Sequence, residues 1–213
     1  SDSSCTAEVG RGHKPDLENQ GIAATVMGNT TTNLYARALD VSLNPSDCVF
    51  LTTYSNDTVA PSAPTFINAS PVSPTKATNY PKFTGTLPSD AVTIRFYNSA
   101  TCQTQVGSGR KTDYEGTGIT VSVTSNTTNT IYARALDAAG NMSPCAYLAD
   151  YVHDSLPPEA PIFNGTTPTS PTNMSITPLV YGATSAGTVL LHFYNDEFCT
   201  TGIGTGTSAE FEN

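Results

Sequence analysis

The chain has 213 residues, with only 18 acidic and 9 basic side chains and a formal net charge of −9. This acidic, weakly charged composition lacks the basic patch with which proteins bind nucleic acid or anionic lipid, so we expect neither partner. No apolar run approaches the roughly 20 residues needed to span a bilayer, so we expect no membrane insertion in this segment.

The sequence repeats itself with a shift of 97 residues and without gaps. The shift places the motif LYARALD, which begins at Leu34, on IYARALD, which begins at Ile131. It also places the FYN motif at Phe96 on a second one at Phe193. A period of this length is too long for a small-unit solenoid and matches one small domain. We therefore predict a tandem array of one domain, an arrangement that usually spans distance or presents a surface.

Four of the five cysteines recur with this period. Cys5 and Cys48 are 43 residues apart, as are Cys102 and Cys145. We predict the disulfides Cys5–Cys48 and Cys102–Cys145, each stabilising the fold by roughly 4 kcal/mol in the chain-entropy model. Buried free thiols are the alternative, and a zinc site is less favoured because no close cysteine pair recurs. Disulfides imply an oxidising, extracytoplasmic setting, and Cys199 is expected to be unpaired within this chain.

The proline-rich junctions at residues 60–64 and 157–161 divide the chain into three segments. Residues 1–59 are predicted to be the C-terminal part of a domain, residues 60–156 a complete domain, and residues 157–213 the N-terminal part of another. Prolines fix φ and hold their neighbours extended, so we predict short, semi-rigid linkers and a rod-like array.

The complete segment predicts an all-β domain, because its apolar residues alternate with a period of two. We expect Val92, Ile94 and Phe96 to face the core, with solvated residues between them. A β-sandwich of about seven short strands, without a helix of ten residues, fits this pattern. The strands are expected near residues 65–68, 82–87, 92–97, 119–124, 131–136 and 145–154.

A succession of motifs follows the repeat: APSAP at 60–64, a Pro-x-x-x-Gly strand from Pro81 to Gly85, VTIRFYN at 92–98, Cys102, YARALDAAGN at 132–141 and Ser143-Pro-Cys145. These motifs resemble the bacterial Ig-like repeats of large secreted or surface-anchored adhesins and extracellular filaments. The resemblance covers the whole chain and implies tandem Ig-like β-sandwich domains, one complete and two partial. It also implies an extracellular or cell-surface location, with neighbouring repeats, copies of the chain itself, or host-surface and matrix glycans as partners.

Each partial segment is expected to leave an open sheet edge and a half-built core. Residues 157–194 of one copy and 1–59 of another would together supply one domain, which makes head-to-tail strand complementation a physical possibility. However, residues 1–19 and 195–213 occupy the same positions of the repeat, a surplus that a dedicated polymerising subunit should not carry. We therefore favour a segment of a longer repetitive chain and keep the self-assembling subunit as the alternative.

Acidic residues recur near the junctions. Asp40 and Asp57 return one period later as Asp137 and Asp154. Calcium held between domains is one interpretation, but one or two carboxylates fall short of the 6–8 oxygens that the ion takes. We expect Asp137 to cap its turn and Asp154 to begin the linker, with no cofactor.

No residue pattern predicts catalysis. His13, His153 and His192 do not recur and have no nucleophile or carboxylate motif beside them, so we expect no enzyme. Arg37 and Arg134 are expected to pair with cross-strand carboxylates.

We predict a structural protein, the disulfide-stapled shaft of an extracellular fibre or surface adhesin. One alternative is a filament subunit that polymerises by strand complementation between its incomplete end domains. Another is a carbohydrate-binding accessory module, which would need an exposed aromatic platform in a chain without tryptophan.

Overall fold

The computed structural model describes residues 3–212, which fall into two compact units divided between Ser155 and Leu156. Strands hold 41% of the residues and helices 7%. All pairings between the strands of this described part are antiparallel, which confirms a mostly β protein. Its longest helix has six residues, and none of its helices is long and apolar enough to cross a membrane.

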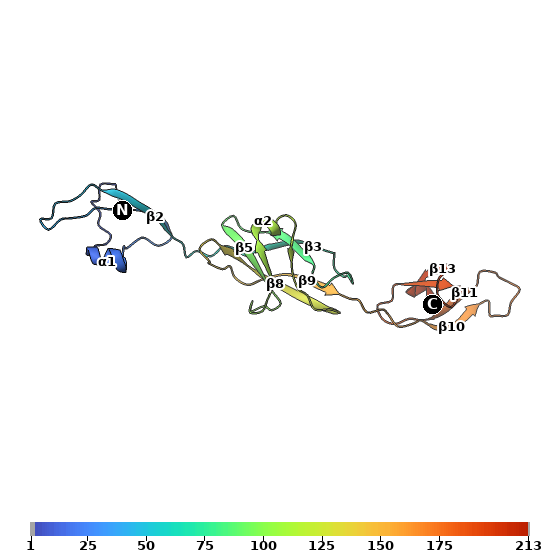
Figure 1. Ribbon diagram of the computed structural model, residues 1–213. Helices are drawn as coiled ribbons and strands as arrows, with labels where there is room; N and C mark the ends of the chain where they lie inside the picture. Colours follow the sequence, from blue (N-terminus) through green and yellow to red (C-terminus); the bar gives the residue numbers. More distant parts are fainter. Residues whose placement is uncertain (1–2, 213) are drawn as a thin grey trace. The chain divides into compact units, whose positions relative to one another are not determined.

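The first unit, coloured from blue to light orange in Figure 1, confirms the strands expected near residues 65, 82, 92, 131 and 145, whereas the strand expected at 119–124 is only Ile119–Thr120. It also contains two short helices and a glycine-rich strand that the sequence pattern did not mark. Its elements are α1 (Lys14–Asn19), β1 (Thr30–Ala36), β2 (Val49–Asn56), β3 (Thr65–Ser70), β4 (Lys82–Thr86), β5 (Ala91–Tyr97), β6 (Gln105–Arg110), α2 (Lys111–Tyr114), β7 (Ile119–Thr120), β8 (Thr127–Asp137) and β9 (Ala146–His153).

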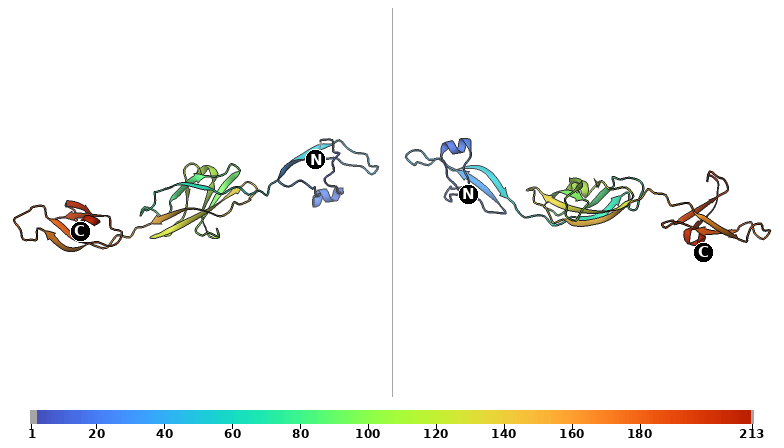
Figure 2. Two further views of the ribbon diagram at one scale, coloured as in Figure 1. Left: turned by 180° about the vertical axis from the view of Figure 1, so that it is seen from behind. Right: turned by 90° about the horizontal axis from the view of Figure 1, so that it is seen from below.

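The strands of residues 65–153 form two sheets, which gather into one body in each view of Figure 2. One sheet has the strand order β3-β4-β7, and the other has the order β6-β5-β8-β9. Strands β1 and β2 form a separate two-stranded sheet. Strand β5 is therefore paired on both edges, whereas β1 pairs only with β2 among the described residues.

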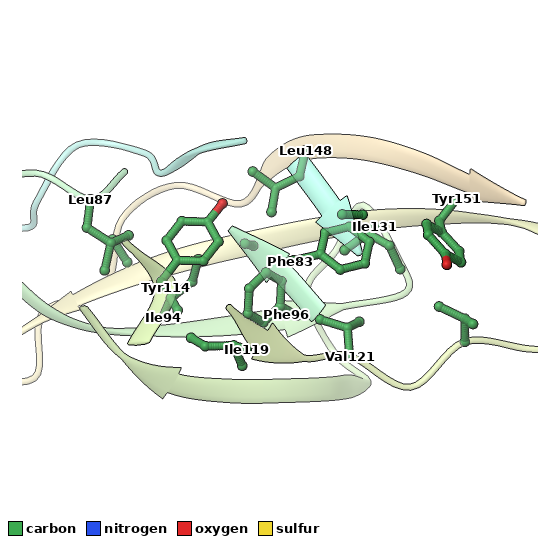
Figure 3. Close-up of a cluster of buried hydrophobic side chains, with 14 of the residues drawn as sticks. Phe83, Leu87, Ile94, Phe96, Tyr114, Ile119, Val121, Ile131, Leu148 and Tyr151 are labelled. Atoms are coloured by element: carbon green, nitrogen blue, oxygen red, sulfur yellow. The ribbon is translucent and has the colours of Figure 1, made fainter. Parts of the chain in front are cut away.

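Both sheets contribute side chains to one hydrophobic core (Figure 3). The ring of Phe83 on β4 lies 5.5 Å from Phe66, 6.0 Å from Phe96 and 5.7 Å from Tyr151, measured between ring centroids. Phe96 in turn lies 5.7 Å from the ring of Tyr114 on α2. Burying such a side chain contributes about 1.5–3 kcal/mol, so this aromatic cluster is a principal source of stability.

The expected inward face of β5 is corrected at one position. Ile94 and Phe96 are fully buried as predicted, but Val92 is 43% exposed. The pairing of β5 with β8 shifts register between Ala91 and Thr93, and such a bulge breaks the alternation of side chains. Ala91, with 1% exposure, takes the core position that the alternation had given to Val92.

The second unit contains two separate two-stranded sheets, β10-β11 and β12-β13. Leu191 on β12 and Phe211 on α3 are buried, whereas Leu179 and Ile203 are 72% and 64% exposed. This unit therefore has a small core and much uncovered apolar surface. Its elements, orange to red in Figure 1, are β10 (Ile162–Thr167), β11 (Leu179–Ala183), β12 (Leu190–Tyr194), β13 (Gly202–Thr207) and α3 (Ser208–Phe211).

Candidate functional site

Two disulfides join the four recurring cysteines as predicted. Cys5 bonds to Cys48 with a Cα–Cα distance of 5.8 Å, and Cys102 bonds to Cys145 with a distance of 5.9 Å. Cys102 lies in the loop after β5, and Cys145 directly precedes the edge strand β9. The second bridge therefore ties a connecting loop to the edge of the four-stranded sheet.

The recurring aspartates cap their own turns. The Asp137 carboxylate accepts hydrogen bonds from the backbone and side-chain nitrogens of Asn141, at 2.8 and 2.9 Å. Asp40 makes the same two bonds with Asn44, both at 2.9 Å. The Asn side chain is the main cause that lowers the pKa of each carboxyl below its ordinary value.

These carboxylates do not gather into a metal site. Asp57 Oδ1 accepts a hydrogen bond from the backbone of Val59 at 2.9 Å, which caps the start of the linker. Within residues 3–212, no three His, Cys, Asp or Glu side chains come together in a way that suits an ion. The contacts at Asp137 and Asp57 are therefore those of turn caps.

The linker before β3 is bonded to a turn further along the chain. The side-chain nitrogen of Asn141, between β8 and β9, donates a 3.1 Å hydrogen bond to the backbone oxygen of Asp57. Asn141 is thus bonded both to the Asp137 carboxylate in its own turn and to the segment that leads into β3.

The histidines lie in different surroundings. His153 is buried, and its Nδ1 accepts a hydrogen bond from the backbone of Asn126 at 3.2 Å. His13 precedes α1 as its N-cap, and His192 lies on β12 beside Tyr194. A structural contact thus accounts for the buried histidine.

The expected pairing of Arg134 with a cross-strand carboxylate is wrong. Strand β8 places Arg134 directly opposite Arg95 of β5, because the register of these strands brings the two arginines together. The Nε atom of Arg134 is buried and has no hydrogen-bond partner in the described part of the chain.

A groove of about 1180 Å³ lies between the two sheets of the second unit. Its lining includes Val180 on β11, Leu191 and Phe193 on β12, Ile203 on β13 and Phe211 on α3. These positions lie 97 residues after Phe83, Ile94, Phe96, Val106 and Tyr114. The positions that form the buried aromatic core of the first unit therefore line an open groove in the second. Sequence reasoning expected a half-built core here but missed the contribution of α3.

The sheet formed by β1 and β2 has exposed apolar side chains at positions whose equivalents are buried one period later. Leu51 and Tyr54 on β2 are 58% and 50% exposed. Their equivalents one period later, Leu148 and Tyr151, are buried in the core of residues 65–153. The β1-β2 sheet thus carries side chains of the kind that cover a core, without a core beneath them in the described residues.

Cys199 is an exposed free thiol in the loop between β12 and β13, the two strands on one side of the groove in the second unit. Its backbone φ is 52°, close to the 50° of Cys5 and the 51° of Cys102. The Asp196 carboxylate holds the loop by accepting hydrogen bonds from the backbone nitrogens of Thr200 and Thr201, at 3.1 and 2.6 Å. Cys199 thus has the backbone φ of Cys5 and Cys102, its equivalents in the repeat, without a disulfide.

No protein-family model matches the chain, and none of the curated proteins matches it in sequence.

Proposed function

We propose that the chain is part of the structural shaft of an extracellular fibre or surface adhesin, built from tandem Ig-like β-sandwich domains with a 97-residue period. The observation that carries this proposal is the pair of disulfides, Cys5–Cys48 and Cys102–Cys145, which have the same sequence separation of 43 residues. The resemblance to bacterial Ig-like adhesin repeats supports the same role. The role is mechanical rather than catalytic.

Recurring hydrogen bonds support a common architecture for the successive segments. The side-chain oxygen of Asn126 accepts a bond from the backbone of Ser155 at 2.8 Å. One period earlier, Asn29 accepts the equivalent bond from Thr58 at 2.7 Å. Both bonds tie the end of a strand pair to the residue that begins a linker, which is where a tensile array must be held.

The redox state of the chain's cysteines in the source cells tests the proposed extracellular location. Intact cells are treated with a membrane-impermeant thiol reagent and then denatured, and the modified cysteines are identified by mass spectrometry. We expect the chain in the surface or secreted fraction, with Cys102 and Cys145 protected as a disulfide. Recovery in the cytosol with these two thiols reduced would overturn the proposed location.

Force spectroscopy tests the mechanical role. The Cys102–Cys145 bridge withholds a loop of 43 residues from extension. At roughly 3.4 Å per residue, reduction should lengthen the unfolded first unit by about 140 Å for this bridge. Unfolding of residues 65–153 at forces no higher than those of a disordered chain would contradict a load-bearing shaft.

A second candidate function, a filament subunit whose copies join by strand complementation, is favoured by the open groove of the second unit. Size determination of the purified chain distinguishes the two, because a subunit associates without other components.

A further inference from the structure

The core of residues 65–153 contains a template for what would fill the groove. There, Ile94 and Phe96 on β5 share one core cluster with Ile131 and Ala133 on the adjacent strand β8 and with Tyr151 on β9, all of them at most 1% exposed. The positions one period after Ile94 and Phe96 are Leu191 and Phe193, which line the groove. A strand pair arranged like β8 and β9 is therefore the kind of element that would fill the groove.

Residues 22–56 carry that strand pair. The positions one period before Ile131, Ala133 and Tyr151 are Leu34, Ala36 and Tyr54. Strands β1 and β2 are already paired antiparallel, as β8 and β9 are. Docking this pair would bury apolar side chains on both partners.

The strand edges match as well. Strand β12 pairs only with β13 in the described chain, so the edge that β5 offers to β8 is open on β12. Unpaired edges of this kind recruit strands from other chains. The β5–β8 register pairs Phe96 with Ala133, and the equivalent pairing would join Phe193 to Ala36.

We propose that residues 22–56 of a second copy of this chain dock into the groove of the second unit, and that Cys199 then captures Cys48 of that copy. The inference rests on the filament-subunit candidate and adds its interface and its covalent link. In the template, Cys102 bonds to Cys145, and these residues correspond to Cys199 and Cys48.

The link forms by thiol–disulfide exchange. The Cys199 thiolate attacks Sγ of Cys48 in the Cys5–Cys48 disulfide of the second copy. The Cys48–Cys199 bond forms, and Cys5 leaves as a thiolate that takes up a proton, so no external oxidant is consumed.

Exchange also resolves a conflict over space. Residues 3–18 of the incoming copy have the same positions in the repeat as residues 197–212, which include β13 and α3 beside the groove. They contact the docking segment, since the backbone of Thr25 donates a 2.7 Å hydrogen bond to Val9. Helix α1 buries none of its residues, so little core packing opposes displacement of this segment. Release of Cys5 breaks the covalent link between this N-terminal segment and Cys48, which directly precedes β2.

The test uses the purified 213-residue chain at increasing concentration, followed by sedimentation velocity, non-reducing electrophoresis and mapping of disulfide-linked peptides. We expect concentration-dependent oligomers and Cys48–Cys199 peptides. The Cys5→Ser variant leaves Cys48 free, so on mild oxidation Cys48–Cys199 links should exceed Cys199–Cys199 links by roughly tenfold or more, because docking raises the effective concentration. In the matched Cys48→Ser variant, which frees Cys5 instead, Cys5–Cys199 links should show no such excess over Cys199–Cys199 links.

A surface variant separates docking from random oxidation. Tyr54 is half exposed, so Tyr54→Asp should leave the chain folded, which circular dichroism checks, while reducing both oligomers and Cys48–Cys199 links at least severalfold. A monomer at all concentrations, or equal amounts of the possible links in Cys5→Ser, would overturn the inference. These measurements use purified protein, so their failure would leave the proposed extracellular shaft to be decided by its own tests.

Discussion

Tyr114 on α2 donates a hydrogen bond from its hydroxyl group to the backbone oxygen of Thr65 on β3, at 2.8 Å. The ring is fully buried against Phe96, and burial raises the pKa of the hydroxyl above its ordinary value. One residue thus closes the core and bonds the first strand of the three-stranded sheet to the helix that follows β6.

Substitution of Tyr114 should separate these two contributions. Tyr114→Phe keeps the ring and loses one hydrogen bond, so we expect the free energy of unfolding to fall by about 1 kcal/mol. Tyr114→Ala opens a cavity and should cost about 3–5 kcal/mol. Urea titration followed by circular dichroism measures both. Equal losses in the two variants would mean that the ring contributes no packing energy.

Removal of the second disulfide should destabilise the first unit. The Cys102→Ser/Cys145→Ser double variant opens a loop of 43 residues, for which the chain-entropy model gives a loss of about 4 kcal/mol. Thermal unfolding of this variant is compared with that of the parent chain under non-reducing conditions. An unchanged melting temperature of the first unit would show that the bridge does not restrict the unfolded ensemble.

The serines of the two equivalent turns offer a matched pair. Ser143 Oγ accepts a 2.9 Å hydrogen bond from the backbone of Ala135 and is buried, whereas Ser46 accepts the same bond from Ala38 and is exposed. Ser143→Ala leaves a buried N–H without a partner and should cost about 1–3 kcal/mol. Ser46→Ala should cost less, because water replaces the hydroxyl. Urea titration of both variants checks the order, and a larger loss at Ser46 would contradict it.

Acid should weaken the Asp137 turn. Its bonds favour the carboxylate, so the pKa in the folded chain lies below the ordinary value of about 3.9. The stabilisation is therefore present above that value and is lost as the pH falls through the lowered folded value. Melting temperatures between pH 7 and pH 2 should show Asp137→Asn less stable than the parent at pH 7 and less sensitive to acid. Asp90→Asn, at an exposed carboxylate, serves as the control for the loss of one negative charge.

The parts of the fold that could be predicted are those with a repeated or alternating signal. Ile94, Phe96 and Ile131 alternate with polar residues, and all three are buried. The disulfides followed from a separation of 43 residues that occurs twice. In both cases, the feature that determines the structure, apolar alternation or cysteine spacing, can be read directly from the sequence.

Strand β6 could not be predicted, because Gly107 and Gly109 stand where it faces β7 and the residues that follow, and only Val106 packs an apolar side chain against the core. A Cβ atom on Gly109 would lie 2.6 Å from Cδ1 of Ile119, and one on Gly107 would lie 2.7 Å from the backbone oxygen of Thr120. The strand therefore lies too close to β7 and the residues beside it for side chains at these two positions, and it leaves no apolar alternation in the sequence. The groove was anticipated only in outline, because Phe211 reaches it from a helix of four residues that carries no periodic signal.

In the proposed shaft, the bond from Asn141 to Asp57 would be among the first contacts of the first unit to meet tension. A pull on residues 57–64 meets this side chain before it reaches β3, so the turn between β8 and β9 takes part of the load. Strand β8 lies in the interior of the four-stranded sheet, paired with β5 on one edge and β9 on the other. In the proposed shaft, force applied at the linker would therefore act on β8 through this turn as well as on β3.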